Sequence, residues 1–317
     1  MSKNCSLVET GELLQAAQKL VIVSHVSPDG DTLGSSLALM HALRSLGKDV
    51  IMNVDDDIST VYSFLPGIEN YRRFAPDETV ETDLLVIVDA SSADRAGNAM
   101  NVVKPRAVLN IDHHKTNTRF ANYLYLDSDA AATAEIIYSL LREMGIGLTT
   151  DIATCIYEGI YTDTGSFKYS NTTSNTLKTA AELLNYGVNP SLISDNMELK
   201  SRSQMEMLRK VLETLTFLQN GKIAYIEIAP ELYDHNVDTD AFISYPRYVE
   251  GVEIALLFKQ VEDNLTRVSF RSKSIDVAKI ALSFGGGGHQ KAAGCSIYAP
   301  MEEAEKTVLQ VVEGLFV

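Results

Sequence analysis

Cysteine and long hydrophobic runs are both scarce in this chain. Its three cysteines, Cys5, Cys155 and Cys295, are odd in number and lie far apart, which gives no sign of a disulfide framework or a cysteine zinc site. We therefore expect all three to be reduced. No segment reaches the ~18 consecutive apolar residues of a membrane span, and the first residues lack the apolar core of a signal peptide. The sequence thus favours a cytoplasmic protein without a membrane partner.

Basic residues are also few: 27 Lys and Arg stand against 42 Asp and Glu, for a net charge of −15. Such a charge argues against a protein that coats long nucleic acid through a general positive field. A small anionic substrate stays compatible with it, because a local basic pocket or a bound cation can reverse the sign at one site. With 45% hydrophobic residues and no low-complexity tract, the 317-residue chain is typical of a globular protein of about two domains.

The first half of the chain alternates strand-like and helix-like segments. Continuous apolar runs of the kind buried on both faces of a parallel sheet occur at residues 19–25, 49–55, 83–91 and 107–114. Helical spacing occurs at residues 32–47, 131–145, 151–161 and 174–185. This order predicts an α/β fold whose N-terminal domain is a mostly parallel sheet flanked by helices.

The second half follows a helical, one-sidedly polar stretch at residues 190–218 that suits a connector between domains. Beyond it we expect strands at 222–229, 252–261, 265–273 and 295–300, with helices at 274–284 and at the C-terminus. This pattern predicts a smaller C-terminal α/β domain. The predicted division is 1–187 for the first domain, 188–218 for a helical linker and 219–317 for the second domain.

Acidic and histidine side chains gather where the predicted strands end. They are His25, Asp29, Asp31, Asp89, Asp112, His113 and His114, with Asp163 following a predicted helix. In open α/β sheets the carboxyl ends of the strands form the ligand-binding edge, so four segments would deliver these groups to one place. Oxygen and imidazole ligands without thiolate favour manganese, magnesium or a similar divalent ion.

The number of these groups favours two metal ions. One ion rarely uses six protein ligands if substrate must also bind, whereas two ions ~3.5–4 Å apart that share a carboxylate use them naturally. Such a pair clamps a phosphoryl group and activates a water molecule for attack on phosphorus. Each residue alone also has an ordinary explanation, since Pro-Asp-Gly-Asp is a good turn and Asp is a good helix cap.

These residues carry a resemblance to a known family. "HVSPDGD", "VIVDAS", the triplet Asp112-His113-His114 and "YTDTG" resemble, in order, the four motifs of the DHH phosphoesterase family. Farther on, "GGGGHQKAAG" at residues 285–294 and "VSFRSK" just before it resemble the DHH-associated C-terminal domain, DHHA1. The resemblance covers essentially the whole chain and implies an active site in the cleft between the two domains.

The resemblance also implies a role for each candidate residue. One ion would be held by His25 and Asp29, the other by Asp31, His113 and Asp163, with Asp89 bridging both. Two catalytic residues are implied beside them. Asp112 would orient His113 or His114, and His114 would face the substrate as a phosphate contact or as the proton donor to the leaving oxygen.

Substrate binding is implied for a second group of residues in the C-terminal domain. Glycine has no Cβ, so backbone amides can approach a phosphate closely, and an arginine fork can grip a terminal phosphate. The simpler alternatives are a flexible loop and a solvent-facing arginine. The implied substrate-binding residues are Arg271, Ser272, Gly286, Gly287, Gly288 and His289.

The compact two-domain form is similar to the nanoRNase and pAp-phosphatase group of the family. It implies a phosphoric ester hydrolase that uses two divalent ions, most favourably Mn²⁺, with Mg²⁺ or Co²⁺ as alternatives. The implied substrates are short RNA oligonucleotides, linear dinucleotides such as pGpG, and pAp (3′-phosphoadenosine 5′-phosphate), but not long nucleic acid. Alternative activities are a cyclic-dinucleotide phosphodiesterase, a short single-strand exonuclease or, without catalysis, a nucleotide-binding module. A homodimer is compatible with this reading.

Overall fold

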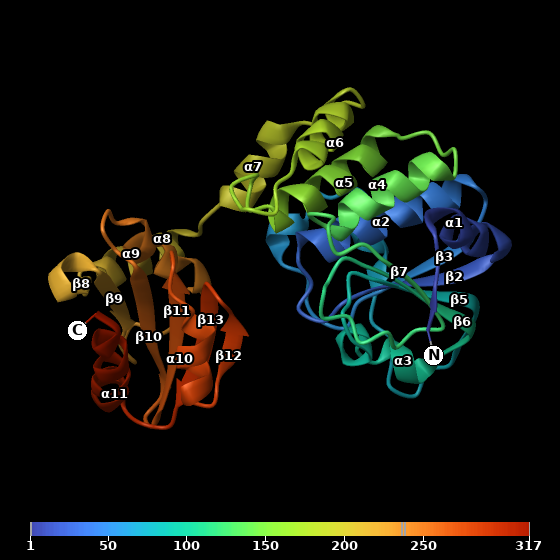
Figure 1. The fold of residues 1–317 in the computed structure, drawn as a ribbon. Helices are drawn as coiled ribbons and strands as arrows, with labels where there is room; N and C mark the ends of the chain where they lie inside the picture. Colours follow the sequence, from blue (N-terminus) through green and yellow to red (C-terminus); the bar gives the residue numbers. More distant parts are fainter. Residues whose placement is uncertain (1, 236, 238, 317) are drawn as a thin grey trace. The chain divides into compact units, whose positions relative to one another are not determined.

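The computed structural model describes every residue except 1, 236, 238 and 317. Its backbone divides into two compact units, one up to Leu199 and one from Lys200 onward (Figure 1). Each unit has its own sheet and its own hydrophobic core. None of the helices in the described part of the chain combines the length and the apolar character that a membrane span needs.

The first unit is built on a seven-stranded sheet in the order β1-β7-β6-β5-β2-β3-β4. All of its strand pairs are parallel, which confirms the predicted parallel sheet. The strands are β1 (Lys3–Asn4), β2 (Lys19–Ser24), β3 (Asp49–Asn53), β4 (Tyr71–Arg72), β5 (Val80–Val88), β6 (Val103–Asp112) and β7 (Tyr123–Leu126). The short strands β1, β4 and β7 were not predicted.

Both faces of this sheet are buried, which explains why its central strands are continuously apolar. On β2, Leu20 and Ile22 belong to the larger core, whereas Val21 and Val23 belong to a smaller core on the other face. Residues of α1, α2, α4, α5, α6 and α7 contribute to the larger core, and residues of α3 and of the 3₁₀ helix Ala93–Ala96 contribute to the smaller one (Figure 1). The helices of this unit are α1 (Leu7–Ala16), α2 (Gly30–Ser45), α3 (Ala99–Val102), α4 (Thr133–Glu143), α5 (Thr150–Asp163), α6 (Ser174–Leu184) and α7 (Pro190–Glu198).

Helices α2 and α5 pack closely because glycine lies where they meet. A Cβ on Gly34 of α2 would come within 2.3 Å of the Cys155 carbonyl oxygen of α5. A Cβ on Gly159 of α5 would meet the Asp31 carboxylate at 2.8 Å. Nearly all of α2 is buried as a result, including its first turn. The spacing of these two helices therefore sets the distance between the polar residues at their ends.

The second unit has a six-stranded mixed sheet in the order β12-β13-β11-β10-β9-β8. Its strands are β8 (Thr216–Leu218), β9 (Ile223–Ile228), β10 (Ile254–Glu262), β11 (Leu265–Ser272), β12 (Gly287–His289) and β13 (Ala292–Ile297). Its helices are α8 (Arg202–Leu212), α9 (Ser244–Tyr248), α10 (Val277–Ser283) and α11 (Met301–Glu313). Helix α8 lies in the stretch predicted as a connector, and its Met207, Leu208 and Val211 are buried in a core with β9 and β10.

Candidate metal centre

Three neighbouring strands bring the predicted ligands to one edge of the first sheet. In the strand order, β5 lies between β2 and β6. Ser24 at the end of β2 pairs with Val88 at the end of β5, and Val88 pairs with Ile111 of β6. The residues that follow, His25, Asp89 and the Asp112–His114 triplet, therefore leave the sheet side by side.

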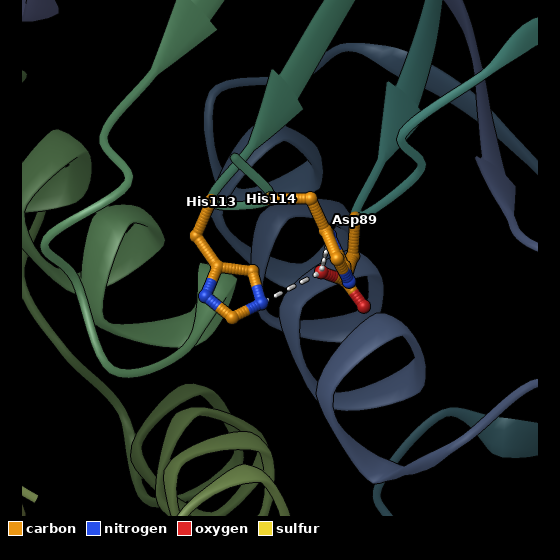
Figure 2. A group of neighbouring side chains, drawn as sticks. All are labelled: Asp89, His113 and His114. Carbon is orange, nitrogen blue, oxygen red and sulfur yellow. Dashed lines mark ion pairs between the residues drawn. The ribbon is translucent and has the colours of Figure 1, made fainter. Parts of the chain in front are cut away.

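Asp89 lies at the middle of this group. Its φ of 61° is left-handed, an unusual backbone conformation for a residue with a side chain and one that clusters at functional sites. One carboxylate oxygen, Oδ2, lies 3.5 Å from His25 Nε2, and the other, Oδ1, lies 3.6 Å from His113 Nε2. Figure 2 shows Asp89 beside His113 and His114, and the dashed lines mark the ion pairs from both rings to Oδ1 of Asp89. The two oxygens of one buried carboxylate thus face two different histidines.

The first ligand group consists of His25, Asp29 and Asp89, whose ligand atoms lie within 4.8 Å of one another. Asp29 also caps α2, because its Oδ1 accepts the amides of Asp31 and Thr32, while its Oδ2 lies 3.7 Å from His25 Nε2. Burial opposes the charge of both partners, but their pairing prevails: the pKa of Asp29 is lowered and that of His25 is raised to about 9. One oxygen of Asp29 therefore caps the helix, while the other oxygen is available as a metal ligand.

The second group consists of Asp31, His113 and Asp163, again within 4.8 Å. Asp31 is buried and accepts the amides of Thr133 and Ala134 at the start of α4. Burial, together with the charges of Asp89 and Asp163, raises the pKa of Asp31 well above its ordinary value. Burial likewise raises the pKa of Asp163 to about 6, against the opposing effect of His113. The sequence predicted that Asp163 follows a helix, but Asp163 is the last residue of α5 itself.

Asp112 and His114 form a pair beside these groups. His114 Nδ1 lies 2.7 Å from Asp112 Oδ1, while Asn117 Nδ2 donates to the other Asp112 oxygen at 2.6 Å. The hydrogen bond with Asp112 raises the pKa of His114, although the burial of His114 opposes this shift. Burial would raise the pKa of Asp112, but the bonds from His114 and Asn117 lower it. Asp112 is fully buried and the His114 side chain is 42% exposed, so a buried carboxylate holds a partly exposed ring.

The donor set fits a pair of divalent ions. It contains carboxylate oxygens and imidazole nitrogens, and no described cysteine belongs to these groups. Burial and, after it, the neighbouring charges of Asp89 and Asp163 raise the pKa of Asp31, as expected for carboxylates gathered at one buried site. His113 Nδ1 also lies 3.2 Å from the Ala130 carbonyl oxygen, which leaves Nε2 for a metal.

Three residues at this centre were missed by the sequence reasoning. Thr133 donates its hydroxyl to Asp89 Oδ1 at 2.7 Å, Asn117 supports Asp112, and Arg95 Nη2 lies 2.9 Å from His25 Nδ1. None of them lies in a motif with a ligand-like spacing. Asn117 lies only five residues after Asp112, so its contact with Asp112 could have been predicted from the local sequence. The contacts of Thr133 and Arg95 depend on tertiary packing and could not.

In the second unit, Arg271 and His289 share one row of the sheet. Arg271 of β11 pairs with Ala292 of β13, which pairs with His289 of β12, and residues directly opposite one another point to the same face. An arginine and an exposed imidazole therefore flank a small alanine. Ser272, in contrast, is buried, and its hydroxyl donates to the Ile275 carbonyl oxygen.

The glycine run is not a free loop, because residues 287–289 form the edge strand β12. A Cβ on Gly286 would come within 2.2 Å of the Gly294 carbonyl oxygen, and one on Gly288 within 2.5 Å of the Ala293 Cα atom. These two glycines are thus required by the packing of β12 on β13. Gly287 differs, since a Cβ there would meet nothing within 4 Å. Packing inside this unit does not explain the glycine at position 287.

The chain is similar to known proteins over nearly its whole length. Residues 19–160 match the DHH family, N-terminal domain, and residues 220–317 match the DHHA1 domain. The chain is 36% identical over 308 residues to the bifunctional oligoribonuclease and PAP phosphatase NrnA of Thermus thermophilus, covering 95% of this chain and 91% of that protein. NrnA of Bacillus subtilis is 27% identical over 90% of this chain and 91% of its own length. The crystal structure of an exopolyphosphatase-related protein from Bacteroides fragilis is similar with a TM-score of 0.88 and 28% identity, covering 97% of this chain and 95% of that one.

Proposed function

The chain belongs to the DHH family of phosphoesterases, and from that premise we propose a metal-dependent phosphodiesterase for short RNA. Its substrates are short oligoribonucleotides and linear dinucleotides such as pGpG, which it cleaves to mononucleotides, and pAp, which it dephosphorylates to AMP. The similarity along nearly the full length to proteins named oligoribonuclease and PAP phosphatase supports this choice. The observation that carries it is the Asp89 carboxylate, whose two oxygens face His25 and His113.

In this proposal His25 and Asp29 hold one divalent ion, and Asp31, His113 and Asp163 hold the other, with Asp89 shared. Two bound ions, most favourably Mn²⁺, supply positive charge to the phosphoryl oxygens and lower the pKa of water. The hydrogen bonds from Thr133 and Ala134 fix the Asp31 carboxylate, and that from Thr133 fixes Asp89, so the site is rigid before substrate arrives.

His114 is the proposed proton donor to the leaving oxygen. With Nδ1 donating to Asp112, the raised pKa favours the imidazolium form of His114, which carries a second proton on Nε2. Donation from Nε2 would complete the departure of the ester oxygen. Asp112 acts as a positioning residue, because it is fully buried and reaches the reaction only through His114.

Residues 1–187 are the proposed catalytic domain, residues 188–218 the linker and residues 219–317 the substrate-binding domain. Arg271 and His289 supply the proposed phosphate contact of the second domain, supported by their common row on the sheet. Gly287 lets a phosphate approach the backbone of β12, since no packing inside the unit needs a glycine there. Ser272, Gly286 and Gly288 support that surface. A cytoplasmic location and a homodimer stay predictions.

A substrate panel with manganese tests this function. We expect turnover of a dinucleotide, a short oligoribonucleotide and pAp, and little turnover of a long oligoribonucleotide, a cyclic dinucleotide or pyrophosphate. Dominant cleavage of the cyclic dinucleotide would replace the proposal with the cyclic-dinucleotide activity. Tight nucleotide binding without turnover would identify a binding module.

The second domain is tested by comparing two substrates. Arg271→Ala and His289→Ala should weaken binding of dinucleotides and pAp, yet leave hydrolysis of a small chromogenic phosphodiester nearly unchanged, because that substrate needs no distant phosphate contact. Gly287→Ala should act in the same way with an unchanged melting temperature. Equal losses on both substrate types would assign these residues to folding or to the catalytic centre.

A further inference from the structure

The guanidinium group of Arg95 lies at the metal centre, and the proposed mechanism gives it no role. Arg95 lies in a short 3₁₀ helix, residues Ala93–Ala96, soon after Asp89. Its Nη2 lies 2.9 Å from His25 Nδ1 and its side chain is half-buried. Although acidic groups surround the centre, Arg95 forms no ion pair with a carboxylate among the residues that the structure describes.

The contact with His25 cannot persist when His25 holds a metal ion. His25 Nδ1 lies 2.9 Å from the Val26 carbonyl oxygen as well as 2.9 Å from Arg95 Nη2. A ring that binds metal through Nε2 carries its hydrogen on Nδ1 and donates it to an acceptor, here Val26. The imidazolium form also has a hydrogen on Nδ1. Since arginine has only donors, its N–H group would then face another N–H group.

The backbone around Arg95 is fixed, so only its side chain can respond. The Val26 amide donates to the Arg95 carbonyl oxygen at 2.8 Å, and the Thr118 amide donates to the Ser91 carbonyl oxygen at 2.8 Å. Asp55 accepts the amide of Asn98 at the other end of the segment. A guanidinium displaced from His25 therefore stays next to the centre.

A phosphate group matches this displaced guanidinium. With the carboxylates committed to metal ions, the remaining anion at the centre is the substrate, and the planar fork of arginine suits two phosphate oxygens. We propose that Arg95 is a phosphate-binding residue, turned away from His25 when metal binds there and then holding a non-bridging oxygen of the substrate phosphate. This inference rests on the proposed phosphoesterase function and adds a contact from the first domain to it.

The test measures phosphate binding apart from turnover. Inorganic phosphate is titrated into the manganese-loaded wild type, Arg95→Ala and Arg95→Lys, and bound manganese is measured in each protein. Loss of a charge-assisted hydrogen bond should weaken phosphate binding by about 10- to 100-fold in Arg95→Ala, with less loss in Arg95→Lys and unchanged manganese content. Without manganese, wild type and Arg95→Ala should behave alike.

Arg106→Ala is the matched control. Arg106 is 85% exposed and lies on β6, six residues before Asp112, which is roughly 20 Å along the strand. The substitution Arg106→Ala removes the same charge as Arg95→Ala, but at a position far from the centre. Phosphate affinity should therefore stay at the wild-type value.

Two results would overturn the inference. Unchanged phosphate affinity in Arg95→Ala would mean that Arg95 does not touch the anion. Loss of manganese in that variant would instead make Arg95 a positioning residue for His25. If the wild type turned over no nucleotide, the proposed function would fail, while the phosphate titration would still decide the role of Arg95.

Discussion

The two ligand groups of the metal centre look alike in sequence but differ in their surroundings. In the group at His25, the Asp29 side chain is 53% exposed and its pKa is lowered by His25 and by two amides. In the other group, Asp31 is buried beside Asp89 and Asp163, and its pKa is raised. Asp29 and Asp31 are separated only by Gly30, so their difference arises from packing. In one group the pairing with His25 lowers the pKa of Asp29, whereas in the other burial and neighbouring carboxylates raise the pKa of Asp31.

The largest effect is expected at Asp89, which both groups share. Asp89→Ala removes a ligand from each ion, so both ions should be lost and turnover should fall below detection. Metal content, turnover and circular dichroism check this outcome. Asp94→Ala, an exposed aspartate five residues away, is the control and should keep both ions. Near-normal turnover in Asp89→Ala would rule out a shared carboxylate.

The next effect separates chemistry from metal binding. His114→Ala should lower turnover by ~10²–10⁴-fold, because a positioned general acid acts in the transition state. Both ions should remain, because the proposed assignment gives His114 no ion to hold, although its ring lies within reach of Asp89 and His113. His113→Ala, the neighbouring histidine, should instead lose the ion at Asp31 and Asp163. If the two variants lost metal equally, the roles assigned to the two histidines would be wrong.

The spacing of α2 and α5 should affect one group more than the other. Gly34→Ala places a methyl group against the Cys155 carbonyl oxygen and so pushes apart the helices that carry Asp31 and Asp163. Overpacking of this kind costs about 1–3 kcal/mol of stability. Metal affinity should fall at Asp31 and Asp163 and stay unchanged at His25 and Asp29. Gly147→Ala, where a Cβ meets nothing within 4 Å, is the control. Chemical denaturation and metal titration measure both effects.

The smallest effect is the pH dependence of the metal-free protein. Asp163 has a folded pKa of about 6 against an ordinary 3.8, so the folded state holds this proton more tightly and stability declines as pH rises through that range. A shift of about two pKa units at ~1.4 kcal/mol each corresponds to at most ~3 kcal/mol for Asp163, and solvent screening of a side chain that is 31% exposed reduces this value. His25 acts in the same direction between 6.5 and about 9, and so does Glu158, whose burial raises its pKa to about 8. Asp29 and Asp112 oppose the trend only below 3.8.

Denaturation of chelator-treated protein across this pH range measures the decline, and Asp163→Asn isolates the contribution of Asp163. That variant should flatten the curve between about pH 4 and pH 6, and so should a saturating divalent ion added to the wild type. A wild-type curve that rises through this range would contradict the raised pKa of Asp163.

Much of the centre could be predicted because of how parallel strands end. The apolar runs before His25, Asp89 and Asp112 place their carboxyl ends at one edge, wherever those strands lie in the sheet. The strand order that makes β2, β5 and β6 neighbours was beyond local pattern, as were the left-handed backbone at Asp89 and the contacts of Thr133 and Arg95. For the glycine run at residues 285–288, a flexible loop was only the simpler alternative to a phosphate-binding segment, and neither reading anticipated that backbone pairing with β13 makes part of it a strand.

The burial of α2 gives a way to measure metal affinity by hydrogen exchange. An amide in a helix covered on nearly all sides exchanges through global unfolding, so its rate reports the stability of the whole unit. A metal ion that binds only the folded protein should slow every such amide by the same factor, about 100-fold at a free metal concentration of ~100 times the dissociation constant. Hydrogen exchange of the α2 amides would thus report how much metal is bound at the centre, even in a catalytically inactive variant.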